Sequence, residues 1–217
     1  MLHATRLRIP IVEVEGGSLT AIAGFDGHQG VALVVEPRRF ASIGDVLARA
    51  DERAEAPFVL VLDSLEDPQN FGTLLRSAEA AGVHGVIFPT RRQAPLSPAA
   101  VKASAGATEH LLLSRIDGLG ETARELQERG IRLIAAEQDA PTAAWDVDLT
   151  GPIAIVVGSE GSGVSGAMRR RCDLLVRFPM AGRIASLNAA TAGALLLFEV
   201  VRQRAAGARL ESGATPT

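Results

Sequence analysis

The sequence predicts an α/β protein with a parallel sheet flanked by helices, and two observations carry the prediction. From Phe58 onward, apolar runs of strand length alternate with helical patterns of about 10 to 15 residues, as they do in βαβ units. The runs are apolar at nearly every position, which is typical of parallel strands buried between two helix layers.

The expected elements follow one another closely along the chain. A helix over 41–56 leads to Pro57, and the strand FVLVL over 58–62 opens the alternating series. The series continues with a helix over 70–81, a strand over 85–89, a helix over 97–107, a strand over 110–113, a helix over 117–129 and a strand over 131–136. It closes with a strand over 153–157, a helix over 166–172, a strand over 174–178 and a helix over 187–204.

The first 38 residues have a different pattern. The β-branched pieces IPIVEV and GVALVV are separated by glycine-rich turns, with no long helical pattern between them. We therefore expect a short β-rich remnant at the N-terminus. The expected domains are this remnant with its linker helix over 1–56, a main domain over 57–206 and a flexible polar tail over 207–217.

Composition limits the possible functions. The net charge of −3 argues against a surface that is basic all over, which a general nucleic-acid binder needs. All basic residues except Lys102 are arginine, however, and several are adjacent, as at 38–39, 91–92 and 169–171. Local phosphate-binding patches and ordinary solvated helix faces both remain open.

The longest apolar stretches have the length of a strand, well short of the roughly 20 residues of a membrane span, so we expect a cytoplasmic protein without a membrane segment. The single cysteine, Cys172, allows no internal disulfide and too few thiolates for a zinc site, and we expect no metal. None of the four histidines has a Ser or acidic partner in a recognisable catalytic arrangement.

In an open parallel sheet, ligands bind at the carboxyl ends of the strands, so the loops there are the candidate sites. The loop after 58–62 leads into Asn70, a possible helix N-cap, and Arg76, which stands among apolar helix neighbours and so needs an anionic partner. The loop after 174–178 contains Ser186 and Asn188 before an apolar helix, where Ser186 is either an N-cap or a functional residue.

The loop after 153–157 reads GSEGSGVS, and its glycines permit close approach of the backbone to a ligand. It lacks the Lys-Ser/Thr of a P-loop and the spacing of a dinucleotide fingerprint. Glu160 at its centre would repel phosphate and attract a cation. The loop therefore suits a cofactor without phosphates.

Together the three loops resemble the three motifs of SpoU-type (TrmH) RNA ribose methyltransferases. The matching segments are NFGTLLRSAEAAG at 70–82, IVVGSEGSGVS at 155–165 and FPMAGRIASLNAATAGALLLFEVVRQR at 178–204. Within the family the chain is most similar to the branch that methylates guanosine riboses in large-subunit ribosomal RNA. Residues 1–38 resemble only the end of an N-terminal ribosomal-protein-like RNA-binding domain.

The resemblance implies a C-terminal trefoil knot, S-adenosylmethionine as cofactor and a homodimer that completes the active site. It also implies a catalytic group with Arg76 contributed by the other subunit, and a cofactor pocket. The catalytic residues would be Asn70, Arg76, Glu160, Ser186 and Asn188, and the cofactor-binding residues Gly158, Phe178, Met180 and Leu187.

The function implied is methyl transfer to a ribose 2′-hydroxyl in structured RNA, ribosomal RNA first and transfer RNA as the alternative. A non-catalytic RNA-binding protein on the same scaffold is a second hypothesis, because the N-terminus is short and the balance of charge is acidic. A nucleotide-dependent oxidoreductase or hydrolase is the third, and the missing nucleotide-binding and nucleophile-elbow motifs count against it.

Overall fold

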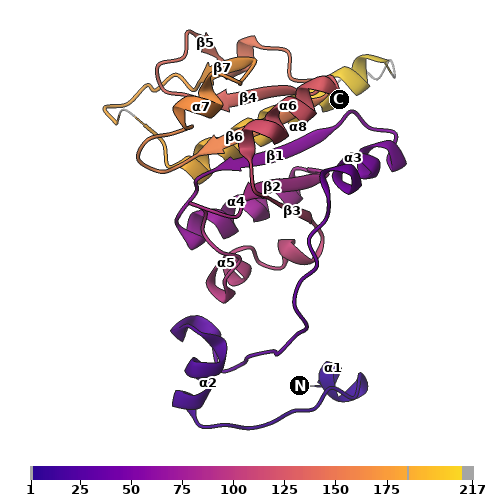
Figure 1. The fold of residues 1–217 in the computed structure, drawn as a ribbon, viewed down its shortest axis with the longest axis vertical. Coiled ribbons are helices and arrows are strands. Elements are labelled where there is room, and N and C mark those ends of the chain that lie inside the picture. The colour runs from indigo at the N-terminus through magenta and orange to yellow at the C-terminus, as the bar shows by residue number, and fades with distance from the viewer. Residues whose placement is uncertain (1, 185, 212–217) are drawn as a thin grey trace. The chain divides into compact units, whose positions relative to one another are not determined.

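A computed structural model describes residues 2–184 and 186–211 of the chain. The chain divides into two units, one that ends at Arg38 and one that begins at Arg39. The second unit contains the whole sheet (Figure 1). It is the unit that positions the candidate site.

The sheet has seven strands, and every pairing between them is parallel. The strand order is β3-β2-β1-β6-β4-β7-β5. The predicted α/β class with a parallel sheet is confirmed. The strands are β1 (Phe58–Asp63), β2 (Gly85–Pro89), β3 (Leu112–Ile116), β4 (Arg132–Ala136), β5 (Thr142–Ala143), β6 (Ile153–Gly158) and β7 (Leu174–Arg177).

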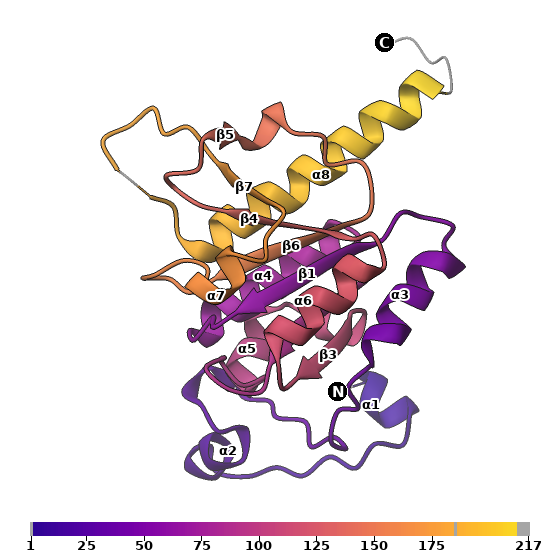
Figure 2. The same cartoon turned by 45° about the horizontal axis from the view of Figure 1, so that its top comes forward.

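Helices cover both faces of the sheet, and Figure 2 shows α6 and α8 on opposite sides of it. Successive residues of a strand point to opposite faces, so Leu60 and Leu62 join one core cluster while Val59 and Val61 join the other. The first cluster is packed by α4 (Pro68–Ala80), α5 (Pro98–Ala103) and α8 (Ala189–Glu211). The second is packed by α3 (Ile43–Glu52), α6 (Leu119–Glu128) and α7 (Gly166–Arg169).

Helix α4 begins two residues earlier than the sequence indicated. Asp67 is its N-cap, with its carboxylate accepting from the backbone N–H groups of Gln69 and Asn70 at 3.0 and 3.4 Å. Pro68 occupies the first turn, where its missing N–H is of no consequence. The alternative interpretation of Asn70 as an N-cap is therefore wrong, and its side chain is available for other contacts.

The contact between α4 and α5 depends on a glycine. A Cβ atom at Gly72 would lie 2.4 Å from the carbonyl oxygen of Ala100 and 2.5 Å from the Cβ of Ala103. Any side chain there would force the two helices apart. The absence of a side chain at position 72 thus fixes how close α4, which carries Asn70, lies to its neighbour.

Helix α3 belongs with the sheet. Val46, Leu47 and Ala50 are buried, and the first two join the second core cluster. The compact unit therefore begins at Arg39, whereas the sequence placed the domain boundary at 56/57. The amphipathic pattern of the helix predicted its existence and not the surface it packs on.

The N-terminal unit differs from its prediction. Its described residues, 2–38, contain α1 (Leu2–Arg6), α2 (Gly16–Ala23) and the 3₁₀ helix η1 (Asp26–His28), and no strand. The expectation of a β-rich remnant is wrong. β-branched residues favour a strand when they can pack against a paired strand, and these pieces pair with no strand among the described residues. Val12 and Val34 are accordingly 78% and 84% exposed.

Three smaller results complete the fold. Helix α8 continues to Glu211, so the first part of the predicted flexible tail is helical, and residues 212–217 lie outside the described part of the chain.

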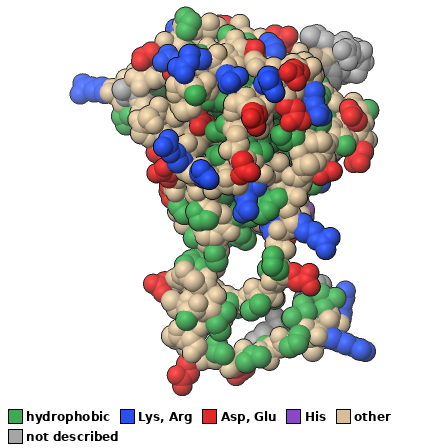
Figure 3. All heavy atoms as spheres, viewed as in Figure 1, with side chains coloured by type: hydrophobic (Ala, Val, Ile, Leu, Met, Phe, Trp, Pro, Cys, Tyr) green, Lys and Arg blue, Asp and Glu red, His purple; other side chains and the backbone are tan. Residues whose placement is uncertain are grey.

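Among the described residues, no helix is long and apolar enough to cross a bilayer. On the face of the second unit seen in Figure 3, basic and acidic side chains are interspersed, in keeping with the small net charge. The expected knot stays a prediction.

Candidate active site

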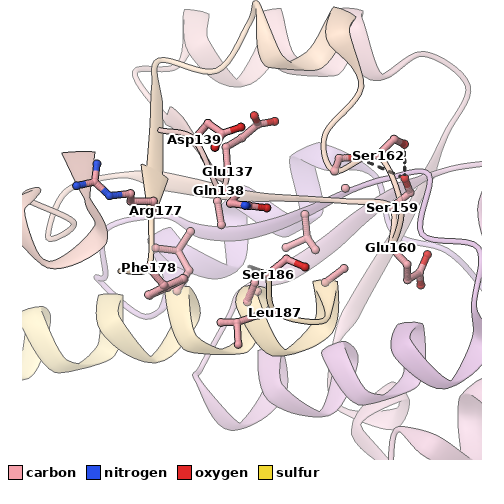
Figure 4. Close-up of a pocket in the computed structure, with 18 of the residues that line it drawn as sticks. Glu137, Gln138, Asp139, Ser159, Glu160, Ser162, Arg177, Phe178, Ser186 and Leu187 are labelled. Carbon is pink, nitrogen blue, oxygen red and sulfur yellow. Dashed lines mark hydrogen bonds between the residues drawn. The ribbon is translucent and has the colours of Figure 1, made fainter. Parts of the chain in front are cut away.

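A cavity of about 550 Å³ opens at the carboxyl ends of β4, β6 and β7. This is the edge of the sheet at which the sequence placed the candidate loops. Figure 4 shows Glu160 and Ser159 on one side of the cavity and Glu137 and Asp139 toward the other. The lining comes from residues 136–139, 156–163, 177–180, 186–187 and the first turns of α8.

The four residues predicted to bind a cofactor, Gly158, Phe178, Met180 and Leu187, all line this cavity. Phe178 is further supported by Trp145, whose ring centroid lies 6.2 Å from its own. The apolar part of the lining is therefore assembled from two of the three motif loops that the sequence singled out.

The loop after β6 closes tightly on itself. Ser159 and Gly163 each donate a backbone N–H to the other's carbonyl oxygen, at 2.9 and 3.0 Å. A Cβ atom at Gly158 would lie 2.1 Å from the carbonyl carbon and oxygen of Gly163, so no other residue fits at this position. The glycines predicted to allow close backbone approach serve first to let the loop approach its own backbone.

Asp63 fixes the far end of that loop. It is the last residue of β1, lies in register with Gly158, is almost fully buried and accepts from the backbone N–H of Ser165 at 2.7 Å. A buried carboxylate needs such a donor. Sequence reasoning missed this residue, although its position at the end of an apolar strand was the available signal.

Three predicted catalytic residues meet in a chain of hydrogen bonds. The Nδ2 of Asn188 donates to the Oδ1 of Asn70 at 3.0 Å, and the Nδ2 of Asn70 donates to the Oε1 of Glu160 at 2.9 Å. Each residue comes from a different motif loop. The carboxylate at one end fixes the direction of both amides, because it can only accept hydrogen bonds when ionised.

The chain of bonds is anchored in α8. The Oδ1 of Asn188 accepts from the backbone N–H of Thr191 at 3.2 Å, in the position of an N-cap. Ser186 lies ahead of this cap, exposed, and lines the cavity. The alternative that Ser186 caps the helix is therefore wrong, since Asn188 does so.

Arg76 stands apart from this group. It is exposed on α4, does not line the cavity and does not contact Glu160 within the chain. Its apolar neighbours Leu75 and Ala78 face the core while Arg76 faces outward, so burial does not oblige its charge to have a partner within the fold. An anionic partner outside the chain stays a prediction. The predicted place of Arg76 in the active site of a second subunit is a proposal taken up below.

A further polar segment of the cavity was missed from the sequence. Glu137, Gln138 and Asp139 follow β4, and Glu137 forms an ion pair with Arg169, with 3.4 Å between Oε2 and Nε. Arg177 holds the same loop by donating to the carbonyl oxygens of Ala140 and Pro141. The available signal was a pair of acidic residues directly after a buried strand.

Two other titratable groups lie away from the cavity. Burial raises the pKa of the Cys172 thiol to about 12, so the thiol stays protonated and unreactive at neutral pH. His84 is fully buried at the opposite edge of the sheet, and burial lowers its pKa. Among the described residues, no cluster of three His, Cys, Asp or Glu side chains is placed to hold a metal ion.

Known proteins show similarity over most of this unit. Residues 57–198 match the model of the SpoU rRNA methylase family. A Bacillus subtilis protein, named for the TrmH family of tRNA/rRNA methyltransferases, is 42% identical over 177 residues, which are 82% of this chain and 71% of that protein.

Solved structures of methyltransferases also match this chain. The SpoU methyltransferase AviRb from Streptomyces viridochromogenes, in complex with the cofactor AdoMet, matches with a TM-score of 0.65 and 34% identity, over 70% of this chain and 59% of that chain. An AdoMet-bound rRNA methyltransferase from Sinorhizobium meliloti matches with a TM-score of 0.67 and 28% identity, over 76% of this chain and 61% of that chain. This chain thus spans less than two thirds of either solved chain.

The motif loops, the cavity that they line and the match over residues 57–198 all point to the same family. This chain belongs to the SpoU rRNA methylase family, a family of S-adenosylmethionine-dependent RNA methyltransferases.

Proposed function

We propose that this protein transfers a methyl group from S-adenosylmethionine to a ribose 2′-hydroxyl in structured RNA, with a guanosine of large-subunit ribosomal RNA as the first candidate target. The observation that carries the proposal is the Asn188–Asn70–Glu160 chain of hydrogen bonds beside the cavity. Transfer RNA is the alternative substrate, since the Bacillus relative is named for both RNA classes. Work on either RNA would place the protein in the cytoplasm.

The cavity fits the cofactor by size and by chemistry. Its volume of about 550 Å³ lies within the range of about 300–1,000 Å³ typical of small-molecule sites. Phe178, Met180 and Leu187 offer apolar contact for a nucleobase, and the cavity edge at Gly158 is bare backbone. The acidic side chains in the lining suit a cationic ligand without phosphates.

The cofactor supplies an electrophilic methyl group on a sulfonium. In the reaction a carbon–oxygen bond forms at the ribose 2′-oxygen, the carbon–sulfur bond breaks, and the hydroxyl proton leaves to water or to an RNA phosphate. A hydroxyl is a poor nucleophile, so the protein must align it and stabilise the developing negative charge. In the proposal Asn70, Asn188 and Ser186 position the ribose, and Glu160 holds the amide of Asn70 in one orientation.

The cationic stabiliser in this scheme is Arg76, supplied by a second copy of the chain. Arginine stays protonated, so it stabilises charge and anchors phosphate and does not remove the proton. Leu195 and Phe198 on α8 are 46% and 47% exposed, whereas Leu196 and Leu197 are buried. An exposed apolar face on a helix that lines the cavity supports a homodimer.

The test combines binding and transfer in one preparation. We expect calorimetric titration to detect binding of S-adenosylmethionine, and labelled methyl groups to reach total RNA from a strain that lacks the enzyme. Arg76→Ala should abolish transfer and retain binding, while Arg124→Ala, another exposed arginine, should change neither. Absence of cofactor binding at millimolar concentration would reject the proposal and favour the non-catalytic RNA-binding protein, whereas binding without transfer would mean that the RNA substrate is not captured.

A further inference from the structure

An arginine lies on an exposed phenylalanine at the β3 edge of the sheet. The Arg115 guanidinium carbon is 4.7 Å from the centroid of the Phe40 ring, and Phe40 as a residue is 36% exposed. The Phe40 ring in turn meets Phe88 edge to face, with centroids 6.1 Å apart and planes at 75°. The guanidinium therefore has an aromatic ring beneath it and is itself exposed.

This arrangement is held in place from below. The backbone N–H of Ala41 donates to the carbonyl oxygen of Leu113 at 2.9 Å, which fastens the segment that carries Phe40 along β3. Phe88 is buried against Phe71, with centroids 5.3 Å apart. Phe88 and Arg115 are also direct partners in the register of β2 and β3. The ring and the guanidinium form a pre-organised platform.

Three more arginines lie next to the platform's own segments in the sequence. Arg39 precedes Phe40, and Arg91 and Arg92 follow the end of β2; all three are exposed. Within the part of the chain that the structure describes, these three and Arg115 form no ion pair with a carboxylate. The acidic residue that follows β3, Asp117, accepts from the hydroxyl of Thr90 at 2.9 Å. The surface thus offers guanidinium groups that phosphates can pair with.

The platform lies at the carboxyl ends of the strands, as the candidate active site does, and on the same face of the sheet. Because all strands are parallel, β2, β3 and β6 end at the same edge. Phe88 and Leu113 belong to the core cluster packed by α4 and α8, so Arg115, two residues after Leu113, is on the same face as those helices. In the strand order β3 is three places from β6, or about 15 Å at about 4.8 Å per strand.

We propose that Arg115 on Phe40 is a stacking platform for an unpaired RNA base next to the methylated nucleotide, with Arg39, Arg91 and Arg92 binding the adjoining phosphates. Proteins recognise single-stranded RNA by stacking its bases on aromatic rings or guanidinium planes and by pairing its phosphates with arginine. The inference rests on the proposed function, and names where on this chain the RNA lies.

The experiment compares two fluorescent probes, a 12-nucleotide oligoadenylate and an oligomer of the same length with abasic riboses. The wild-type protein should bind oligoadenylate more tightly, since only that probe has bases to stack. Arg115→Ala should lower oligoadenylate affinity about fivefold or more, with a smaller loss on the abasic probe. Arg115→Lys keeps the charge and should lose the preference between the probes while it binds the abasic one normally.

Arg124→Ala is the matched control, because Arg124 is an exposed arginine on α6 that pairs with Glu128 at 3.6 Å. Equal loss on both probes in Arg115→Lys, or unchanged oligoadenylate affinity in Arg115→Ala, would overturn the platform. Melting temperatures exclude unfolding, and the lysine variant carries the test if the alanine variant melts early. Cofactor titration separates the two proposals: a wild-type protein that binds no S-adenosylmethionine refutes the methyltransferase, whereas the probe comparison alone decides the platform.

Discussion

Two polar clusters lie at opposite edges of the same sheet and differ in burial. At the amino edge, His84 is fully buried, accepts from the backbone N–H of Phe58 at 2.9 Å and meets Glu55 at 3.0 Å. At the carboxyl edge, Asn70, Glu160 and Asn188 bond to one another, with Asn70 half-buried and the other two exposed. The first cluster satisfies groups that folding buries, and the second leaves its groups accessible to a ligand.

Arg204 belongs to the amino-edge cluster. Its guanidinium donates to the carbonyl oxygens of Ala56, Pro57 and Gly151 at 3.0, 3.2 and 2.9 Å, and lies over the Phe58 ring at 5.0 Å. These bonds fasten the C-terminal part of α8 to the starts of β1 and β6. The comparison teaches that hydrogen-bonded polar side chains stabilise the fold at the amino edge, whereas at the carboxyl edge they stay accessible to a ligand.

The largest expected effect is on catalysis, at the carboxyl edge. Asn70→Ala should lower methyl transfer by about 100-fold or more, the loss typical of one oriented hydrogen-bond donor in an active site. Its free energy of unfolding should fall by about 1 kcal/mol or less, because Asn70 is only half-buried and its partners Glu160 and Asn188 are exposed to water. Transfer assays and urea unfolding of the same variant check both halves, and a large loss of stability would erase the contrast between the edges.

At the amino edge the expected effect is on stability. His84→Ala should lower the free energy of unfolding by about 2 kcal/mol, since the Phe58 N–H is then buried without its acceptor. Methyl transfer per folded molecule should stay unchanged. Urea unfolding and transfer assays measure the two quantities, and lost activity in fully folded protein would show that the edges are not independent.

Glu137 sharpens the description of the cavity. Its side chain is 15% exposed and is paired with Arg169. Glu137→Gln should weaken binding of S-adenosylmethionine about tenfold, the typical effect of one hydrogen bond to a charged group. Calorimetry measures the change, with Glu125→Gln on the surface of α6 as control. Unchanged affinity would mean that Glu137 serves only its ion pair.

The smallest effect concerns pH and again separates the edges. Burial lowers the pKa of His84 below the ordinary value of 6.5, so the unfolded chain binds the proton more readily than the folded one. His84 therefore contributes stability above the unfolded pKa, and the contribution is lost as the pH falls below about 6.5. Melting temperatures from pH 7.5 downward should fall less steeply in His84→Asn, and equal slopes would contradict the assignment.

Local sequence patterns predicted most of the sheet, and the motif resemblance singled out three residues that the structure brings together. The apolar runs at 58–62 and 153–157 became adjacent central strands because a continuous apolar run has to be buried on both faces. Asn70, Glu160 and Asn188 were identified by the motif resemblance, and their mutual hydrogen bonds were not. The four residues expected to bind the cofactor line one cavity, and their role in binding stays a prediction.

What the sequence did not reveal depends on contacts between distant segments. Asp63 bonds to Ser165, 102 residues away, and no local pattern indicates that pair. The short strand β5 and the place of α3 on the sheet are likewise set by tertiary packing. The N-terminal error had the opposite cause: β-branched composition was read as pairing where no partner strand exists among the described residues.

The contact of Gly72 with α5 limits how this protein can evolve. The carbonyl oxygen of Ala100 is a backbone atom, so no replacement on α5 removes the overlap that a side chain at position 72 would create. A substitution elsewhere in a core is often compensated by a smaller neighbour, but here compensation has to come from displacement of a whole helix. In related sequences this position should therefore stay glycine even where the residues at 100 and 103 vary.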